Sequence, residues 1–268
     1  MYYGLLGLAS KKAAGYGTLT TAWIAATGET DTTILGALNT LESDLTTYGL
    51  TSKMKALYPF VGGTAAKHKF NFMDARDLDA AFRLTFNGGW THSSTGALPN
   101  GTNGYADTYY NLSTQSTTSN LSAGFYSRVN STVAGADFGG ANSSDNGTQL
   151  FLKYTNDITY WSVNDYSTAG ASNIISDTRG FFVMNKVSLS EKRIYKNGTQ
   201  IHTAVPINNT APNANIIIGA RKLGADAVNL FSNREHSFTY FGDTLTDTEV
   251  ANFYTAVQAF QTTLSRNV

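Results

Sequence analysis

The sequence predicts a mostly β fold, a sandwich of two sheets, and three observations support this prediction. Short apolar runs alternate with polar turns from about residue 54 onward. Only two segments, one near each end of the chain, show the spacing of an amphipathic helix. Asn-Gly pairs, which supply the positive φ angles of tight hairpin turns, separate several of the apolar runs. They are Asn87-Gly88, Asn100-Gly101, Asn103-Gly104, Asn146-Gly147 and Asn197-Gly198. This alternation of strands and turns is typical of a sandwich.

Length and charge limit the classes of function. The chain of 268 residues is long enough for one large β domain with a smaller appendage, or for two domains. Its 19 basic residues balance 19 acidic residues, so no long-range field favours nucleic acid or an anionic membrane. We therefore expect no nucleic-acid partner. Only 14% of residues are charged, so uncharged polar groups cover the surface, as in extracellular β proteins and virion parts.

The lack of Cys and the pattern of the first twelve residues exclude further classes of protein. The chain contains no Cys, so it has neither a disulfide framework nor a thiolate metal site. The first eight residues are apolar, but no basic region precedes them, and Lys11 and Lys12 follow too soon for a membrane span. We expect no signal peptide and no membrane insertion.

We divide the chain into an N-terminal arm with a helix at 1–55 and a sandwich with a terminal helix at 56–268. The apolar anchors of residues 1–29 are too sparse to close a core: Leu5, Leu6, Leu8, Tyr16 and Trp23. This arm either lies on its own domain or docks onto another subunit. Attachment to other virion proteins, or homo-oligomerisation, is the role we predict for it.

A helix is predicted from Asp31 to Tyr48. Its apolar residues recur at steps of four, three and four and form one stripe: Ile34, Leu38, Leu41 and Leu45. Thr30 or Asp31 can cap its start, and Gly49 can end it with Leu50 folding back on the last turn. The stripe predicts packing on the sandwich, with a short oligomeric bundle as the alternative.

The strands are predicted between residues 57 and 241. The most distinct pair is the hairpin from Arg193 to His202, in which Asn197-Gly198 suits a type I′ turn. The long polar segment after Phe86 is expected to be a loop. The predicted strands are Leu57–Phe60, Lys69–Phe72, Ala80–Phe86, Leu121–Ser127, Gln149–Tyr154, Ile158–Val163, Gly180–Val187, Lys192–Tyr195, Thr199–Thr203, Ile216–Ala220 and Phe238–Phe241.

A second helix is predicted at the C-terminal end. Thr246 and Glu249 have the spacing of a capping box. The apolar residues that follow lie on one helical face: Val250, Phe253, Tyr254, Val257 and Phe260. A single helix after a sheet is expected to pack this face against the sandwich.

The closing half of the chain resembles a known domain type. The elements occur in the order Ile194-Tyr-Lys-Asn-Gly-Thr, Ala214-Asn-Ile-Ile-Ile-Gly-Ala-Arg221, Phe231–Phe241 and Leu245-Thr-Asp-Thr-Glu249. This order resembles laminin-G and concanavalin-A-like jelly-roll domains, with their x-Tyr-x-Asn-Gly hairpin, Ile-Gly strand and short Leu-(Ser/Thr)-x-x-Glu helix. The resemblance implies a lectin-like jelly-roll sandwich.

A second resemblance concerns Leu57-Tyr-Pro-Phe-Val-Gly-Gly-Thr, Asp77-Leu-Asp-Ala-Ala-Phe-Arg-Leu and the segment from Gly88 to Asp107. These stretches are similar to a segment in structural proteins of tailed bacteriophages. The resemblance covers most of the chain from about Asp31. It implies a virion component, made in the host cytoplasm, at a tail, fibre or capsid surface.

The acidic residues do not match a glycanase pattern. Sandwich glycanases use two carboxylates on one strand, typically Glu-x-Asp-x-x-Glu or Glu-x-Asp-x-Glu. The Glu residues here are Glu29, Glu42, Glu191, Glu235 and Glu249, and none has a carboxylate two residues on along a β pattern. A retaining pair, about 5 Å apart, would have to come from distant strands or from Asp alone. We predict no catalytic residue and no enzyme.

Metal binding is not predicted either. Asp74, Asp77 and Asp79 alternate with Arg76 and Arg83, which favours surface ion pairs over a calcium loop. The looser loop containing Asp137, Asn142, Asp145 and Asn146 is a second, weaker calcium candidate. The residues His68, His92, His202 and His236 show no metal-ligand spacing. We expect no cofactor.

Two aromatic constellations are candidates for sugar binding, which needs exposed aromatic faces with amides or carboxylates nearby. One is Trp90 with His92. The other is Tyr160-Trp-Ser-Val-Asn-Asp-Tyr166, in which Trp161 and Val163 share one strand face while Tyr160 and Ser162 share the other. Its candidate residues are Trp161 and, at the strand end, Asn164, Asp165 and Tyr166. In the alternative, both tryptophans fill the core.

The sequence therefore predicts a non-enzymatic bacteriophage virion protein whose lectin-like sandwich faces outward, with a host-surface glycan as the candidate ligand. The alternative function is a carbohydrate-binding module or glycan-cleaving enzyme that acts alone.

Overall fold

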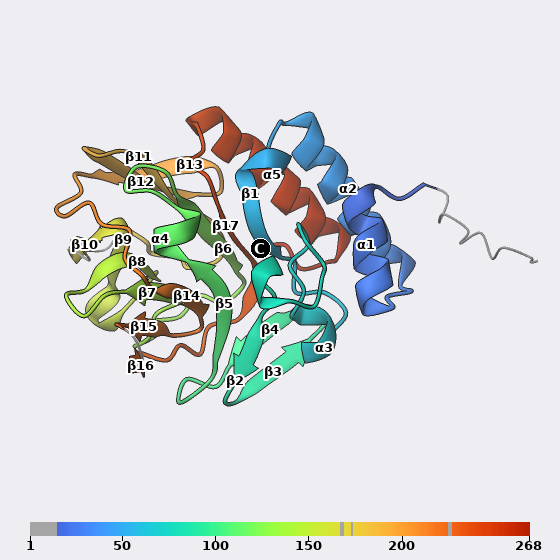
Figure 1. Cartoon of the computed structure of the whole chain (residues 1–268), viewed down its shortest axis with the longest axis horizontal. Coiled ribbons are helices and arrows are strands. Elements are labelled where there is room, and N and C mark those ends of the chain that lie inside the picture. The colour runs from blue at the N-terminus through green and yellow to red at the C-terminus, as the bar shows by residue number, and fades with distance from the viewer. Residues whose placement is uncertain (1–14, 167–168, 173, 225–226) are drawn as a thin grey trace, which may run out of the picture.

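The architecture is a two-sheet sandwich with a layer of helices on one side (Figure 1). A computed structural model describes residues 15–166, 169–172, 174–224 and 227–268. The predicted fold class, a mostly β sandwich with helices at both ends, is confirmed. Within those ranges, no helix is long and apolar enough to cross a membrane.

The first sheet lies between the helices and the second sheet. Its strands are antiparallel, and β1 (Met54–Tyr58) pairs with β17 beside the main path. The described part of this eight-stranded sheet runs in the order β13 (Thr199–Ala204), β12 (Glu191–Lys196), β11 (Gly180–Ser188), β6 (Ser122–Ser127), β17 (His236–Gly242), β4 (Gly96–Pro99) and β3 (Trp90–Ser93).

The second sheet covers the other side of the core. Beside its main path, β15 (Arg221–Leu223) pairs with β7 and with β16 (Ala227–Asn229). Within the described ranges the main path of this nine-stranded sheet is β10 (Ala169–Ser172), β9 (Ile158–Tyr166), β8 (Asn146–Phe151), β7 (Phe138–Ala141), β14 (Asn215–Ile218), β5 (Tyr105–Asn111) and β2 (Thr85–Asn87).

Successive side chains of the first sheet point to opposite faces, so two hydrophobic cores form, one on each face. Phe182 and Met184 of β11 face the second sheet, whereas Phe181 and Val183 face the helices. In β6 and β17 every residue is buried, because both faces of the sheet are covered. On the helical side, Phe253 packs edge-on against Phe181 with ring centroids 5.2 Å apart.

Five helices are described: α1 (Thr18–Thr27), α2 (Thr32–Thr47), α3 (Ala65–His68), α4 (Leu112–Gln115) and α5 (Asp247–Thr263). Short 3-10 turns occur at Thr51–Lys53, Asp79–Ala81 and Thr155–Asp157. Figure 1 shows α2 and α5 beside each other against the sandwich, with α1 outside α2.

The described part of the N-terminal arm lies on its own domain. Trp23 of α1 is fully buried, and its ring meets those of Phe70 and Phe72 at centroid distances of 6.2 and 6.1 Å. The predicted anchors Leu5, Leu6 and Leu8 lie outside the described residues. Both predicted parts of the chain, 1–55 and 56–268, contribute to the core on the helical side, since α1 and α2 join the cluster that contains α5.

Both amphipathic helices are confirmed together with their caps. The Asp31 side chain accepts hydrogen bonds from the backbone N–H groups of Thr33 and Ile34 at the start of α2. Gly49 has a φ of 70°, and Leu50 N donates to Leu45 O at 2.7 Å. The capping box of Thr246 and Glu249 begins α5.

The hairpin of β12 and β13 is also confirmed. Asn197 and Gly198 have φ angles of 51° and 76°, as a type I′ turn requires. Gly198 lies against Tyr254 of α5, where an added Cβ would stand 3.2 Å from Ala251 Cα. This close approach also favours glycine at that position.

Two predicted strands are wrong. Lys69–Phe72 forms no strand because the Asn71 side chain takes the place of a neighbouring strand: it accepts from Leu57 N and donates to Lys55 O and Ala81 O. The segment Ala80–Phe86 begins in a 3-10 turn, and its strand starts only at Thr85.

The long polar loop predicted after Phe86 is wrong as well, because it contains three strands. In β5, Ala106, Thr108 and Tyr110 point inward and are buried, while their neighbours are half-exposed. The inward positions include Thr108, whose hydroxyl donates to Ile216 O at 2.7 Å. The strand therefore lacks the apolar alternation that would reveal it in the sequence.

The acidic clusters pair with arginine. Asp74 bonds Arg76 at 2.5 Å and Asp79 bonds Arg83 at 2.7 Å, so the prediction of surface ion pairs is confirmed. In the second calcium candidate, Asp137 pairs with Arg234 and Asp145 pairs with Arg221. No group of three or more potential metal-ligating carboxylate or imidazole side chains occurs in the described part of the chain.

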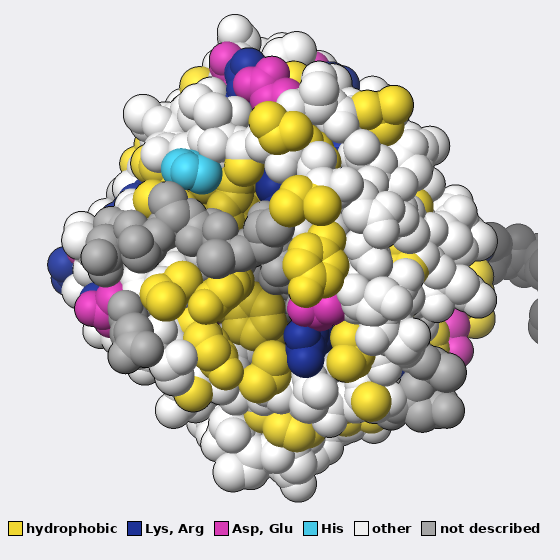
Figure 2. All heavy atoms as spheres, turned by 90° about the vertical axis from the view of Figure 1, so that its left-hand side faces the viewer, with side chains coloured by type: hydrophobic (Ala, Val, Ile, Leu, Met, Phe, Trp, Pro, Cys, Tyr) yellow, Lys and Arg dark blue, Asp and Glu magenta, His cyan; other side chains and the backbone are white. Residues whose placement is uncertain are grey.

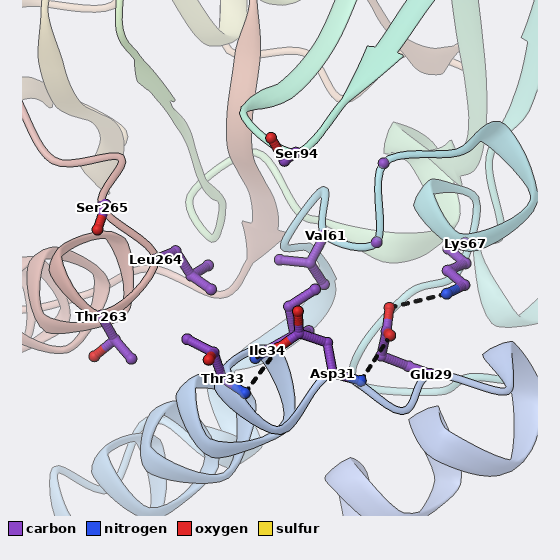
Figure 3. Close-up of a pocket in the computed structure, with 12 residues that line it drawn as sticks. Glu29, Asp31, Thr33, Ile34, Val61, Lys67, Ser94, Thr263, Leu264 and Ser265 are labelled. Atoms are coloured by element: carbon purple, nitrogen blue, oxygen red, sulfur yellow. Dashed lines mark hydrogen bonds and ion pairs between the residues drawn. The ribbon is translucent and has the colours of Figure 1, made fainter.

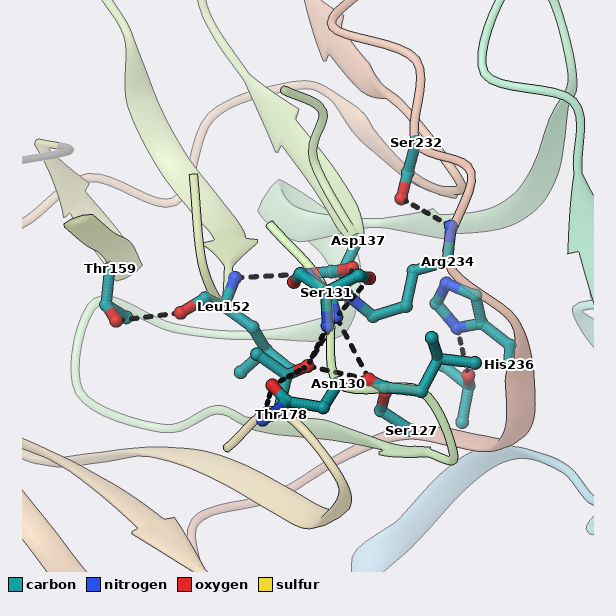
Figure 4. A network of polar contacts seen from close by, with 12 residues as sticks. Ser127, Asn130, Ser131, Asp137, Leu152, Thr159, Thr178, Ser232, Arg234 and His236 are labelled. Atoms are coloured by element: carbon teal, nitrogen blue, oxygen red, sulfur yellow. Dashed lines mark hydrogen bonds and ion pairs between the residues drawn. The ribbon is translucent and has the colours of Figure 1, made fainter. Parts of the chain in front are cut away.

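A buried polar network ties together the loops at one end of the sandwich. The side chains of Arg234 and Asp137 are each 1% exposed, and Arg234 Nε donates to Asp137 Oδ1 at 2.8 Å. Figure 4 shows the rest of the guanidinium directed at Ser131 and Thr178. Asp137 Oδ2 accepts from Leu152 N at 2.8 Å, so this ion pair also fixes the start of the loop after β8.

Replacing Asp137 with Ala should lower the free energy of unfolding by about 3–5 kcal/mol, because the Arg234 cation would stay buried without its partner. Urea unfolding followed by tryptophan fluorescence measures this loss. Asp177→Ala is the matched control, since it breaks an exposed pair with Arg179 and should cost at most about 1 kcal/mol. Equal losses in the two variants would contradict the prediction.

Two buried histidines should make the fold sensitive to acid. Burial lowers the pKa of both His68 and His236 to about 3, with smaller contributions from nearby His92, Arg234 and Arg266. Below the unfolded pKa of about 6.5, the unfolded chain binds protons that the folded chain does not. The free energy of unfolding should therefore fall as pH drops from about 6.5 toward about 3. Between pH 6 and 4, His68→Gln should reduce this slope by roughly 1.4 kcal/mol per pH unit, whereas an unchanged slope would contradict the assignment.

Candidate functional site

The first sugar-binding candidate pair, Trp90 and His92, is brought together on β3. The two rings stack at a centroid distance of 6.1 Å and an interplanar angle of 23°. Trp90 is half-buried, and its Nε1 donates to the backbone oxygens of Asn87 and Tyr105. His92 Nδ1 lies 2.9 Å from Nδ1 of buried His68. Trp90 Nε1 and His92 Nδ1 are therefore used for contacts within the protein.

The second candidate group is not assembled as a binding rim. Trp161 is 1% exposed and belongs to the core between the sheets. Asn164 and Asp165 are fully buried, because β9 continues to residue 166 rather than ending at 163. The Asn164 amide donates to Ser116 and Thr117, and Asp165 forms an ion pair with Lys192.

The expected exposure of Trp161, Asn164 and Asp165 is thus corrected: their side chains are used inside the fold. Tyr166 alone among these four residues is on the surface, with 41% of its area exposed. The core alternative holds for Trp161, while Trp90 packs against the edge of the same core.

The opposite face of β9 lines a hollow on the outer side of the second sheet. In β9, Trp161 points into the core, so its neighbour Tyr160 points to the outer face. In β8, Leu150 points into the core, so Phe151, which pairs with Tyr160, points to the same outer face. We call this site the β8–β9 hollow; its volume is about 180 Å³, and Figure 2 shows hydrophobic side chains gathered around a hollow on this side of the molecule. It is lined by Asp145, Phe151, Tyr154, Tyr160, Arg221 and Leu230.

One wall of the β8–β9 hollow is aromatic. Phe151, Tyr154 and Tyr160 meet edge to face, with centroid distances of 5.5 Å from Phe151 to Tyr154 and 5.8 Å from Tyr154 to Tyr160. The two tyrosines are half-buried, so part of each ring remains available. Mutual edge-on packing holds the three rings in place before any ligand arrives.

The other wall is polar. Arg221 Nη1 donates to Asp145 Oδ1 at 2.8 Å, and Arg221 Nε donates to Asn229 Oδ1 at 3.0 Å. The arginine crosses the sheet over Gly139, where an added Cβ would lie 3.4 Å from Arg221 Cγ. The side chains of Arg221 and Asp145 keep 15% and 32% of their area exposed, so both reach solvent in the hollow.

Unpaired polar atoms lie next to this wall. Gln149 Nε2 donates to Asp145 Oδ1 at 3.1 Å, and Gln149 is paired with Ser162 across β8 and β9. Both residues are fully buried, yet Gln149 Oε1 and Ser162 Oγ have no hydrogen-bond partner within the described chain. Buried polar atoms without partners are costly, so they are typical places for water or ligand groups to bind.

A larger hollow of about 480 Å³ lies between the start of α2 and the end of α5 (Figure 3). Its charged groups are already engaged: Glu29 accepts from Thr30 N, Asp31 N and Lys67 Nζ. Its remaining lining is aliphatic or hydroxyl, without an aromatic face. A hollow of about 510 Å³ beside α1 is mainly apolar. The β8–β9 hollow is therefore the better site for a polar ring-shaped ligand.

Sequence reasoning placed Tyr160 and Ser162 on the face opposite Trp161, and this is confirmed. The sequence does not reveal the polar wall that faces Tyr160, because Arg221 and its partner Asn229 come from the β15–β16 hairpin, 61 and 69 positions after Tyr160. In the sequence, Asp145 is a candidate only for calcium binding. The one local signal was the clustering of aromatic residues at Phe151, Tyr154 and Tyr160 on both sides of a turn.

No protein-family model and no curated protein sequence matches the chain. Among solved structures, it is similar to botulinum neurotoxin type C, whose cell entry depends on interaction with two ganglioside molecules. Identity is 13%, the TM-score is 0.51, and the match covers 79% of this chain and 53% of the toxin chain.

Two further solved structures have lower scores. One is the binding domain of Paraclostridial Mosquitocidal Protein 1, at 13% identity, TM-score 0.48 and coverage of 76% of this chain and 52% of the toxin chain. The other is domain 4 of the arabinanase AbnA from Geobacillus stearothermophilus in complex with arabinotriose, at 15% identity, TM-score 0.45 and coverage of 75% and 98%. The chain spans about half the length of the matched toxin chains.

The arrangement of the strands in two sheets and the similarity to the neurotoxin structure establish the fold. The chain adopts a lectin-like, jelly-roll type of β-sandwich, with helices at both ends.

Proposed function

We propose that this protein binds glycans and that one sugar unit sits in the β8–β9 hollow. The observation that carries the proposal is the pairing of an aromatic wall with a polar one: Tyr160 and its neighbours stand on one side, and the Arg221–Asp145 pair stands on the other. The hollow is smaller than the roughly 300–1,000 Å³ of pockets for drug-sized ligands. It therefore suits a single ring of a longer chain.

A pyranose ring matches both walls. Its C–H face can stack on Tyr154 or Tyr160, while neighbouring hydroxyls can bond the carboxylate of Asp145 and the guanidinium of Arg221. Charged groups of both signs suit a hydroxyl, since it donates and accepts. A solved structure of the same fold belongs to a toxin that interacts with gangliosides, which supports glycans as the ligand class.

Binding without cleavage is the activity we propose. Asp145 is the one carboxylate among the residues that line the β8–β9 hollow, and it is held by Arg221. Hydrolysis by the common retaining or inverting routes needs two carboxyl groups facing each other across the bond. A glycan-cleaving enzyme remains the alternative function, and release of new reducing ends from a bound glycan would favour it.

The second proposed role is that of a virion structural protein of a bacteriophage, homo-oligomeric and attached through its N-terminal arm. It rests on the resemblance of the segment from Gly88 to Asp107, which passes from β3 and β4 of the first sheet to β5 of the second. Strands β8 and β9 lie on the opposite side of the molecule from α1 in Figure 1, so in such a particle the hollow that they line would face outward to host-surface glycans.

Glycan binding is tested on an array and then by titration of the best ligand. Tyr160→Ala should weaken binding about tenfold or more, a loss of roughly 1.4 kcal/mol, because it removes a stacking face. Tyr166→Ala is the matched control: it removes the same residue type from the same strand, outside the hollow, and should change affinity less than about twofold. An array without signal, or loss in Tyr166→Ala alone, would overturn the assignment.

The virion role is tested on purified particles from a phage that encodes this chain. Mass spectrometry should find its peptides at a stoichiometry of several copies per particle, and labelled antibody should decorate a tail, fibre or capsid surface. Particles that contain none of the polypeptide would refute this role while leaving the glycan experiment unaffected.

A further inference from the structure

Lys192 and Asp165 meet between the two sheets and have no access to solvent. Lys192 comes from β12 of the first sheet and Asp165 from β9 of the second, and their side chains are 1% and 0% exposed. Lys192 Nζ contacts Asp165 Oδ2 and lies 4.9 Å from the centre of the Trp161 ring. The two reactive groups are thus held together in a dry, aromatic environment.

Burial makes Lys192 a better nucleophile than a surface lysine. Desolvation lowers the pKa of its ammonium group, although the contact with Asp165 opposes this shift. A lysine needs to lose its proton before it can attack a carbonyl carbon, and desolvation is a recognised way to reach the neutral amine. The proton has an acceptor at hand in Asp165 Oδ2.

The surroundings of Asp165 suit attack at its carboxyl carbon. Oδ1 faces the backbone N–H of Ile207 at 3.4 Å, and the ammonium of Lys186 is close enough for the Asp165 charge to raise its pKa against the effect of burial. The N–H group at Oδ1, together with the nearby cation of Lys186, would stabilise negative charge that develops on the carboxyl group during attack. Oδ2, on the Lys192 side, is the oxygen placed to leave.

We propose that Lys192 and Asp165 join spontaneously in an amide bond that links the two sheets. A proton first passes from Lys192 Nζ to Asp165 Oδ2, which gives an amine and a carboxylic acid. Nζ then forms a bond to Cγ, the Cγ–Oδ2 bond breaks, and Oδ2 leaves as water with two protons that both came from Nζ. No oxidant, reductant or cofactor takes part.

The amide bond removes the free-energy cost of keeping two charged groups buried. Two charges without solvent require good mutual geometry to offset their desolvation, and an amide has no net charge to desolvate. The bond would also join β9 of the second sheet to β12 of the first sheet across the sandwich. This inference does not depend on glycan binding.

Intact-mass spectrometry of the full chain under denaturing conditions tests the bond. The wild type should weigh one water less than its sequence, and peptide mapping should yield one branched peptide containing Lys192 and Asp165. Lys192→Arg should have its full sequence mass, because a guanidinium does not attack. Asp165→Asn should lose ammonia in place of water.

Lys67→Arg is the matched control, since it alters a different ion pair, between partly exposed Lys67 and buried Glu29, and should keep the water deficit. Full sequence mass in the wild type would overturn the proposal, as would a deficit that persists in Lys192→Arg. If Lys192→Arg does not fold, the branched peptide of the wild type decides the question by its presence or absence.

Discussion

The fold depends on one constraint: the centre of the eight-stranded sheet is covered on both faces. Its central strands β6 and β17 have no solvent-facing side, so every residue in them packs against either the second sheet or the helices. This requirement explains why α5 and α2 are integral to the domain. It also explains why the charged groups enclosed in the fold, such as Arg234, are matched with carboxylates or backbone oxygens.

The predictable part of the fold is the part in which burial and apolar pattern coincide. The two long helices, the Asn197-Gly198 hairpin and strands such as Gly180–Ser188 follow from periodicity and capping chemistry. Strand β5 does not, because Thr108 occupies an inward position. Its hydroxyl donates a hydrogen bond to Ile216 O of β14, the neighbouring strand in the sheet, which is distant in the sequence. Asn71 illustrates the reverse case, in which one amide side chain replaces the strand pairing that an apolar run suggested.

The candidate site was less predictable than the fold, for a physical reason. Aromatic residues near a turn are visible locally, but Tyr160 and Arg221 line one hollow only when β15 pairs with β7 in the second sheet. Asp165 and Asn164, which the sequence places at a strand end, are buried, since β9 extends three residues further than its apolar stretch. The role of the Asp165 carboxylate depends on Lys192, which the opposite sheet places beside it. Because Lys192 is distant in the sequence, this pairing could not be predicted.

Arg266, which follows α5, connects segments that are far apart in the sequence. Arg266 is 1% exposed, and its guanidinium donates to the backbone oxygens of Phe60, Pro59 and Ser237, across as many as 207 positions of sequence. Contacts of such long range are slow to form, because the intervening chain must be ordered first. During synthesis, the carbonyl groups of the turn after β1 therefore cannot meet this donor until 207 further residues have been added. The contacts between Arg266 and the turn after β1 can therefore form only after Arg266 has been translated.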